Sequence, residues 1–328
     1  MITPKFELPD ELKPEFRKAK RLECFTVFYL ASVVAIMFLV MGSSQAMKTA
    51  WLEDTLSLIP AISFLVASRF YDRPATNKFP YGYHRAFSIA FLCGSVALLV
   101  IGLYLAIDSA FSLIKAERPT IGSVFIFGHQ VWMGWVMIGA LLYSGIPPVV
   151  IGTIKKPIAE KLHNKIMHTD AVTQKADYLT SAAAIGGVLG IGWGYWWADS
   201  VAAIVISLSI VRDGVSHLKN ATADLMDRHP TRVDDDRVSE LIEAIEKVVL
   251  SWSWVDDYAV RFREHGQVYF GEVFIILSDK CEATERITRG TNELKSIHWK
   301  VFDVTIMPVK NLPERECEDG SNKSRLKS

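Results

Sequence analysis

Residues 166–196 read IMHTDAVTQKADYLTSAAAIGGVLGIGWGYW, and this stretch decides how the whole chain is interpreted. It is long enough to form a helix that crosses a bilayer, which requires about 20 apolar residues. Asp177 nevertheless lies inside it, about ten residues or roughly 15 Å from the charged end. A carboxylate at that depth is costly unless it meets a cation, a proton or hydrogen-bonding neighbours within a helical bundle. We therefore interpret Asp177 as a functional residue of a membrane protein, rather than as one that only hydrogen-bonds neighbouring helices.

The composition fits a membrane protein that carries a water-soluble domain. Half of the residues are hydrophobic, while the charged residues, 22% of the chain, gather at the two ends and in short loops. The formal net charge is zero, which by itself says nothing about nucleic acid; we expect no nucleic-acid partner for a membrane protein of this kind. Cys24, Cys93, Cys281 and Cys317 show no CxxC spacing and predict neither a disulfide nor a zinc framework. We expect no resident cofactor and no enzymatic activity.

Six hydrophobic segments predict an α-helical membrane protein with six transmembrane helices. A basic N-terminal segment, residues 1–22, precedes the membrane domain, residues 23–218. The first apolar run is too long for a signal peptide and lacks a small-residue cleavage site, so we expect it to be retained. The predicted segments are Phe25 to Ala46, Thr49 to Tyr71, Ala86 to Leu113, Val131 to Ile154, Ile166 to Trp196 and Ser200 to His217.

The distribution of basic residues predicts how the segments are oriented in the lipid bilayer. Lysine and arginine gather before the first segment, between the second and third, between the fourth and fifth, where we place Lys155, and after the sixth. The opposite connections contribute Lys48, Lys115 and Arg118. By the positive-inside rule, we expect both termini in the cytoplasm of a multi-pass protein of the cytoplasmic (inner) membrane.

The chain changes character beyond Asp227, where apolar runs become short and charges frequent. Periodicity predicts a small α+β domain in the cytoplasm over residues 228–312. The tail, residues 313–328, is charged and rich in serine and asparagine, and we expect it to be disordered. The expected elements are a helix over Val233 to Leu250, strands over Asp257 to Arg263 and Gln267 to Leu277, a helix over Ala283 to Ile297 and a strand over Val301 to Val309.

Polar residues of the fifth segment fall on one side of the predicted helix. Asp170 and Asp177 are spaced i, i+7, which returns almost to the same angle, and Thr173 and Gln174 flank that line. Their carboxylate, hydroxyl and amide oxygens can complete the shell of a hard, partly hydrated cation. We expect these side chains to contribute to a cation site.

The second segment supplies another carboxylate. Asp54 precedes Ser57 by about one helical turn, and Pro60 interrupts the hydrogen-bond ladder and frees carbonyl oxygens. We expect Asp54 to meet Asp177 and form the core of the site. Glu53 lies beside a tryptophan typical of the membrane interface, so we expect it to be a solvated charge at the outer surface.

Three motifs flank these segments: PYGYHR at 80–85, WWAD at 196–199 and DLMDR at 224–228. With the six segments and the acidic residues of the second and fifth, they make nearly the whole chain resemble the cation diffusion facilitator, or cation efflux, family. The resemblance implies a homodimeric antiporter that exports a divalent metal cation in exchange for protons. It also implies a ferredoxin-like cytoplasmic domain that aids dimerisation.

The positions that set metal selectivity depart from the family pattern. The family usually supplies two ligand pairs, each spaced i, i+4, whereas the matched positions here hold Asp54 with Leu58 and Thr173 with Asp177. Oxygen ligands without imidazole or thiolate favour Mn²⁺, Mg²⁺ or Fe²⁺ over Zn²⁺. Two alternatives remain: a monovalent cation/proton antiporter, which needs only one or two carboxylates, and a non-transporting membrane scaffold.

Charged residues at the cytoplasmic side predict how the two domains are coupled. Arg85 follows the second segment and Asp227 the sixth, and we expect them to form an ion pair near the dimer axis. His265 lies on a predicted turn and His298 near the end of a predicted helix, and we expect each to be a surface residue rather than a ligand. The domain would then dimerise by packing, without a bridging metal.

Overall fold

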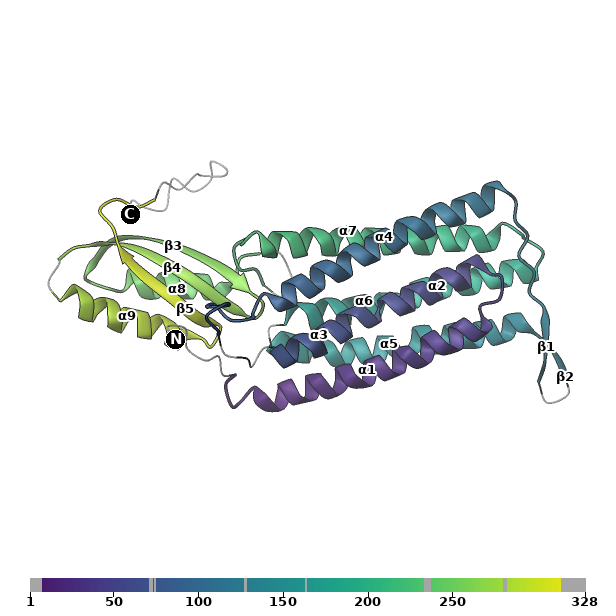
Figure 1. Ribbon diagram of the computed structural model, residues 1–328, viewed down its shortest axis with the longest axis horizontal. Coiled ribbons are helices and arrows are strands. Elements are labelled where there is room, and N and C mark those ends of the chain that lie inside the picture. Colours follow the sequence, from purple (N-terminus) through teal and green to yellow (C-terminus); the bar gives the residue numbers. More distant parts are fainter. Residues whose placement is uncertain are drawn as a thin grey trace. The chain divides into compact units, whose positions relative to one another are not determined.

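The computed structural model describes residues 8–70, 73, 75–126, 129–162, 164–232, 237–279 and 282–313. It divides into a helical unit, which reaches Arg228 and includes His265–Gln267, and a smaller α+β unit (Figure 1). Each unit has its own hydrophobic core. The predicted disordered tail lies outside the described residues from position 314 onward.

The helical unit is a bundle of long helices that lie alongside one another (Figure 1). Its helices are α1 (Lys13–Val40), α2 (Gln45–Leu56), α3 (Leu58–Phe70), α4 (Ala86–Ile114), α5 (Met133–Lys161), α6 (Lys165–Gly192) and α7 (Ala198–Leu225). The most extensive contacts join α4 to α7 and α5 to α6. The predicted second segment therefore forms two helices, α2 and α3, which meet at Ser57 near the predicted interruption.

Five stretches among the described residues are long and apolar enough to cross a membrane. They are α1, Gln45–Arg69 across α2 and α3, Ser88–Ile114 within α4, α5 and α7. Helix α6 has 28 residues, as many as α1 and α7, but its polar N-terminal half sets it apart from these five. Large apolar side chains such as Phe28, Leu39 and Ile114 remain exposed on the bundle, as is expected of a surface that faces lipid.

The first membrane helix ends earlier than predicted. Helix α1 stops at Val40, and the predicted end, Ala46, already lies in α2. Between them Gly42 adopts a left-handed backbone conformation with φ of +53°, which a residue without Cβ tolerates best. Ser44 then caps α2, because its hydroxyl accepts a hydrogen bond from the Met47 amide at 3.1 Å.

Asp199, the acidic residue of the WWAD motif, secures the same helix end. Its carboxylate accepts hydrogen bonds from the Ser44 hydroxyl and the Gln45 amide, both at 2.6 Å. A negative charge at a helix N-terminus satisfies free amides and complements the helix dipole. Asp199 therefore fixes α7 to the start of α2 and has a structural role.

Helices α5, α6 and α7 also differ from the predicted bounds. Helix α5 continues past the predicted end to Lys161, so Lys155 is a helix residue and not part of a connecting loop. Helix α7 continues to Leu225, whereas α6 ends at Gly192, before the predicted end at Trp196. Hydropathy misses such extensions because the last turns of a helix need not be apolar.

A hairpin joins α4 to α5 and was not predicted. Strands β1 (Ser123–Ile126) and β2 (His129–Trp132) pair antiparallel, with Val124 opposite Val131. Each strand has four residues, too few to give a clear period-two pattern.

The α+β unit contains a small mixed sheet with two helices that share its core. Its elements are α8 (Glu240–Leu250), β3 (Val255–His265), β4 (Val268–Leu277), α9 (Ala283–Ile297) and β5 (Val301–Pro308). The strand order is β3-β4-β5, and β4 runs parallel to β5. The predicted helix over 283–297 agrees with α9, but α8 begins only at Glu240, because Ser239 caps it. Residues 233–236 of that predicted helix lie outside the described residues.

Candidate functional site

Asp54 lies in the last turn of α2, just before the break at Ser57. Its two carboxylate oxygens each lie 2.8 Å from the hydroxyl of Ser144 on α5, which donates to one of them at a time. The sequence analysis missed Ser144, a small polar residue next to Gly145 in an otherwise apolar helix. Such a residue is common in helix packing, so its type alone gave no sign of this role.

Asp177, which we expect to meet Asp54, lies on α6, within electrostatic range of the Asp54 carboxylate. The two carboxylates interact electrostatically, and each residue is only 7% exposed. Two negative charges buried this close repel each other and lose most of their hydration. The arrangement suits a cation, which would neutralise both carboxylates.

Glu53 is placed differently from the expected solvated position at the outer surface. Its carboxylate interacts with the hydroxyl of Thr180 on α6 and lies within electrostatic range of Asp177 and Asp54. Glu53 thus faces the same region of the bundle as the predicted core residues. The neighbouring tryptophan, Trp51, is only partly buried and donates its indole N–H to the Val34 carbonyl of α1 at 3.0 Å.

Asp170 is engaged by a buried lysine. The Lys155 ammonium lies 2.5 Å from the Asp170 carboxylate and 2.8 Å from the carboxylate of Glu23 on α1. The side chains of Lys155, Glu23 and Asp170 are 0%, 1% and 3% exposed. Placing Lys155 in a cytoplasmic loop was therefore wrong, because the helix carries it into the bundle, where two acidic partners offset the cost of burial.

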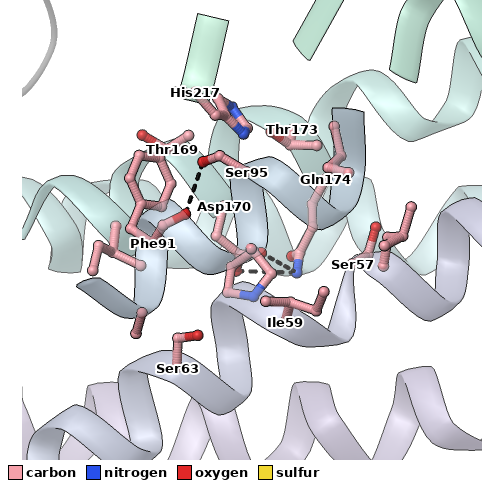
Figure 2. Close-up of a pocket in the computed structure, with 16 residues that line it drawn as sticks. Ser57, Ile59, Ser63, Phe91, Ser95, Thr169, Asp170, Thr173, Gln174 and His217 are labelled. Carbon is pink, nitrogen blue, oxygen red and sulfur yellow. Dashed lines mark hydrogen bonds between the residues drawn. The ribbon is translucent and has the colours of Figure 1, made fainter. Parts of the chain in front are cut away.

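A cavity beside this cluster gathers the remaining predicted residues. Gln174 donates hydrogen bonds to Asp170 at 3.2 and 3.4 Å, and Ser57, Thr173 and His217 line the same cavity (Figure 2). The side-chain carbonyl oxygen of Gln174 is buried and has no hydrogen-bond partner in the described part of the chain. The six predicted residues thus fall into two sets: Asp54 and Asp177 lie within electrostatic range of each other, and Asp170, Gln174, Thr173 and Ser57 line the cavity.

His217 on α7 is a cavity residue that the sequence analysis did not identify. It lies at the end of the predicted sixth segment. A histidine at such a place can contact lipid headgroups, so the sequence does not indicate a cavity residue. Its ring lies 5.5 Å from the ring of Phe91 on α4, between centroids. Only the packing of α7 against α4 shows that this imidazole faces the cavity.

The donor atoms of the site are not arranged as a closed metal centre. Within the residues that the structure describes, no three His, Cys, Asp or Glu side chains lie close enough to hold one metal ion together. The available donors are carboxylate, hydroxyl and amide oxygens, together with one imidazole at the cavity wall. An incomplete, oxygen-rich shell fits an ion that binds and leaves better than a permanently held structural metal.

Arg85 and Asp227, the residues expected at the join of the two domains, form an ion pair in the helical unit. Both side chains are partly exposed, and a guanidinium N–H of Arg85 also donates to the Leu225 carbonyl at 3.5 Å. The pair therefore connects the loop before α4 to the end of α7. Partial exposure limits what such a pair contributes to stability.

The two histidines expected at the surface are less exposed than predicted. His265 is buried, and burial together with the charge of Lys300 lowers the pKa of His298. The Nδ1 atom of His298 accepts a hydrogen bond from the Lys300 amide at 3.2 Å. This bond occupies one of the two ring nitrogens, either of which could otherwise bind a metal.

Comparisons with known proteins agree with this arrangement. Residues 24–226, more than half of the chain, match the cation efflux transmembrane domain. The manganese efflux system protein MneS of Bacillus subtilis (strain 168) is 23% identical over 239 residues, which cover 73% of this chain and 76% of the relative. MneP of the same strain, also a manganese efflux system protein, is 22% identical over 240 residues, covering 70% and 74% of the two chains.

The cation-efflux pump FieF of Yersinia pestis (strain Pestoides F) matches over a longer range. It is 21% identical over 281 residues, covering 84% of this chain and 86% of the relative. Residues 24–226, which match the cation efflux domain, include the helices that carry Asp54, Asp177 and the cavity. The chain therefore belongs to the cation efflux family, a family of membrane transporters of metal cations and not of enzymes.

Proposed function

We propose that this protein is a secondary transporter that exports a divalent metal cation from the cytoplasm in exchange for protons. The observation that carries the proposal is that Asp54 and Asp177 are buried within electrostatic range of each other, while neither has an ion-pair partner among the residues that the structure describes. A buried charge that is not compensated inside the protein marks a place where an ion binds in transit. The compensated carboxylate of Asp170 provides the contrast.

The proposed substrate is a hard cation, Mn²⁺, Mg²⁺ or Fe²⁺, in preference to Zn²⁺. The donors near Asp54 and Asp177 are the oxygens of Ser144 and Thr180, and the cavity adds those of Thr173 and other polar residues. Oxygen-rich, partly hydrated shells suit these ions, whereas Zn²⁺ prefers tetrahedral sites with His or Cys. The names of MneS and MneP, both manganese efflux proteins, give further support to manganese.

Exchange for protons follows from competition for the same charges. When the cation leaves, Asp54 and Asp177 repel each other, and taking up a proton relieves that repulsion. If the bundle exposes the pair alternately to the two sides, cation exit and proton uptake become coupled. The cavity lined by Ser57, Thr173 and Gln174 is the proposed path from one side.

The proposed architecture has six spans, with α6 as the one whose polar half lines the transport path. At 28 residues α6 is long enough to cross, and its polar side chains face the bundle interior. We assign residues 1–22 to a cytoplasmic segment, 23–218 to the membrane domain and 228–312 to a ferredoxin-like domain that supports a homodimer. Both termini would lie on the cytoplasmic side of the inner membrane, and we expect the dimer to persist in the presence of a chelator.

Transport by the purified full-length protein in proteoliposomes tests this proposal. We expect an outward proton gradient to drive uptake of Mn²⁺, Mg²⁺ or Fe²⁺ more strongly than uptake of Zn²⁺, Na⁺ or K⁺. A pH-sensitive dye inside the vesicles should report proton movement in the opposite direction. Flux of Na⁺ or K⁺ alone would identify a monovalent antiporter, and no flux of any cation would indicate a membrane scaffold.

A further inference from the structure

Two consecutive prolines interrupt the hydrogen-bond ladder in the middle of α5. Pro147 has no backbone N–H, so it cannot bond the carbonyl oxygen four residues earlier, that of Tyr143. Pro148 leaves the Ser144 carbonyl oxygen without its helical donor in the same way. Inside a membrane bundle such carbonyl oxygens must be bound by other protein groups, because the lipid core supplies no water. The proline pair thus leaves two carbonyl oxygens that a neighbouring helix can bind.

Tyr29 on α1 supplies the missing donor. Its hydroxyl donates to the Tyr143 carbonyl oxygen and lies 3.4 Å from the Ser144 carbonyl oxygen. The side chain is buried, and its ring meets the Tyr143 ring edge-on, with 5.3 Å between the ring centroids. A hydroxyl has one proton, so Tyr29 donates to one carbonyl at a time while it stays beside both. This contact replaces backbone bonds that α5 cannot make for itself.

The α5 turn that is bound in this way also contacts the proposed cation site. The side-chain hydroxyl of Ser144 lies 2.8 Å from both carboxylate oxygens of Asp54. Gly145, the next residue, faces α6, because a Cβ atom added there would lie 2.7 Å from the Cβ of Ser181. Ser181 follows Asp177 by about one helical turn. The turn therefore contacts α1, α2 and α6, and a shift of its backbone would move the hydroxyl that orients Asp54.

We propose that Tyr29 is a positioning residue for the cation site, which holds Ser144 against Asp54 across the break in α5. This inference rests on the proposed transport function. With its carbonyl oxygens bound from α1, the turn keeps a fixed place although its ladder bonds are missing, and the Ser144 hydroxyl points at the Asp54 carboxylate. Loss of the Tyr29 hydroxyl leaves these carbonyls without that donor, so the turn shifts. Asp54 then keeps its carboxylate but loses its orientation.

Mn²⁺ affinity of the full-length protein in nanodiscs, measured by calorimetry, tests the role of Tyr29. We expect Tyr29→Phe to weaken Mn²⁺ affinity by on the order of 10-fold, the lower end of the effect of losing a group that orients a metal ligand. In proteoliposomes the same variant should raise the KM for Mn²⁺ more than it lowers the maximal rate, because Asp54 and Asp177 are both retained.

Tyr143→Phe is the matched control. The Tyr143 hydroxyl joins the same two helices through the Ser32 hydroxyl, which lies 2.8 Å away and donates to the Tyr29 carbonyl oxygen at 2.6 Å. The control removes the same group from a neighbouring ring, but it leaves the Tyr29 hydroxyl on the carbonyl oxygens of α5. We expect wild-type Mn²⁺ affinity in Tyr143→Phe. Equal losses of affinity in the two variants would overturn the proposal, because they would point to packing of α1 against α5.

A rescue variant separates positioning from a general loss of stability. Adding Pro147→Ala to Tyr29→Phe gives the Tyr143 carbonyl oxygen a backbone donor again, and we expect it to recover most of the lost affinity. The rescue variant also carries the test if Tyr29→Phe alone does not fold. Weak Mn²⁺ binding by the folded rescue variant would overturn the proposal.

A double-mutant comparison shows whether Tyr29 acts through Ser144. In a Ser144→Ala background, Tyr29→Phe should have little further effect, because the hydroxyl that Tyr29 positions is already gone. Wild-type affinity in Tyr29→Phe, or a full additional loss in the Ser144→Ala background, would overturn the role of Tyr29 while leaving transport by the wild type intact. Absence of metal-dependent flux in the wild type would instead overturn the proposed function itself.

Discussion

Two groups of buried carboxylates lie in the same helical bundle and are balanced in opposite ways. Glu23 and Asp170 share the ammonium of Lys155, at 2.8 and 2.5 Å, and all three side chains are almost fully buried. Asp54 accepts a hydrogen bond from a serine hydroxyl, and Asp177 lies within electrostatic range of Asp54 and, with a smaller effect, of Lys155. The first group contains its own cation, and we propose that the second binds a cation in transit.

The difference explains why acidic residues of one helix face have different roles. Asp170 and Asp177 are both on α6 and spaced i, i+7, so the helix alone makes them equivalent. Lys155 on α5 contacts only one of them directly. We infer that the Lys155 cluster joins α1, α5 and α6 as a structural unit, while the Asp54 pair does the transport chemistry.

The largest expected effect comes from removing the charge of Asp54 or of Asp177. Asp177→Asn or Asp54→Asn should reduce metal-dependent flux by at least about 100-fold, because a direct ligand matters no less than the groups around it. Expression, dimerisation and thermal unfolding should stay close to wild type, since neither carboxylate has an ion-pair partner among the described residues. Normal transport by both variants would show that the pair is not the site.

Removing the ammonium of Lys155 should destabilise the cluster that it forms with Glu23 and Asp170. Lys155→Met leaves two buried carboxylates without a partner, and we expect a loss of about 3 kcal/mol in the free energy of unfolding. Lys156→Met is the control, because Lys156 is 42% exposed and its 3.8 Å pair with Glu160 contributes about 0–1 kcal/mol at most. Unfolding of both variants in detergent, followed by circular dichroism, measures the difference.

Neutralising the whole cluster sharpens the same test. The triple variant Lys155→Met, Glu23→Gln, Asp170→Asn should recover much of the stability lost in Lys155→Met, because no uncompensated charge remains. If the triple variant unfolds as easily as Lys155→Met, the lysine would act through packing and not through charge.

Changing the donor atoms around Asp54 and Asp177 should alter the selectivity between Zn²⁺ and Mn²⁺ by a smaller factor. Leu58→Asp with Thr173→His recreates the four-ligand pattern and adds an imidazole one turn before Asp177. We expect the ratio of Zn²⁺ to Mn²⁺ transport to rise on the order of tenfold, or about 1.4 kcal/mol. An unchanged ratio in a folded, active double variant would mean that these positions do not face the site.

The smallest effect is expected at an ion pair that water partly screens. Arg85 and Asp227 are 40% and 36% exposed, so Arg85→Ala should cost at most about 1 kcal/mol of dimer stability or coupling. Lys78→Ala, in the same loop, provides the control, because Lys78 contacts the ring of Phe79 at 5.8 Å. Equal dimer dissociation constants for the two variants would argue against a specific contribution of the pair.

The sequence alone established the class of protein and much of its local structure. Long apolar runs, the depth of Asp177 and the short motifs pointed to a membrane transporter of the cation efflux family. Periodicity also located α9 and the three strands of the α+β unit, because alternation and helical spacing are local properties. The expectation that Asp54 meets Asp177 came from the acidic residues inside the second and fifth apolar segments.

Only the tertiary structure decided which polar groups belong together. Lys155 looked like a loop residue, Glu53 like an interfacial charge, and Ser144 like a packing residue, yet each lies beside a buried carboxylate. These contacts join residues on different helices, and they depend on how far each helix extends and where α2 breaks. Helix packing is fixed by the whole bundle, whereas periodicity reports only one helix at a time.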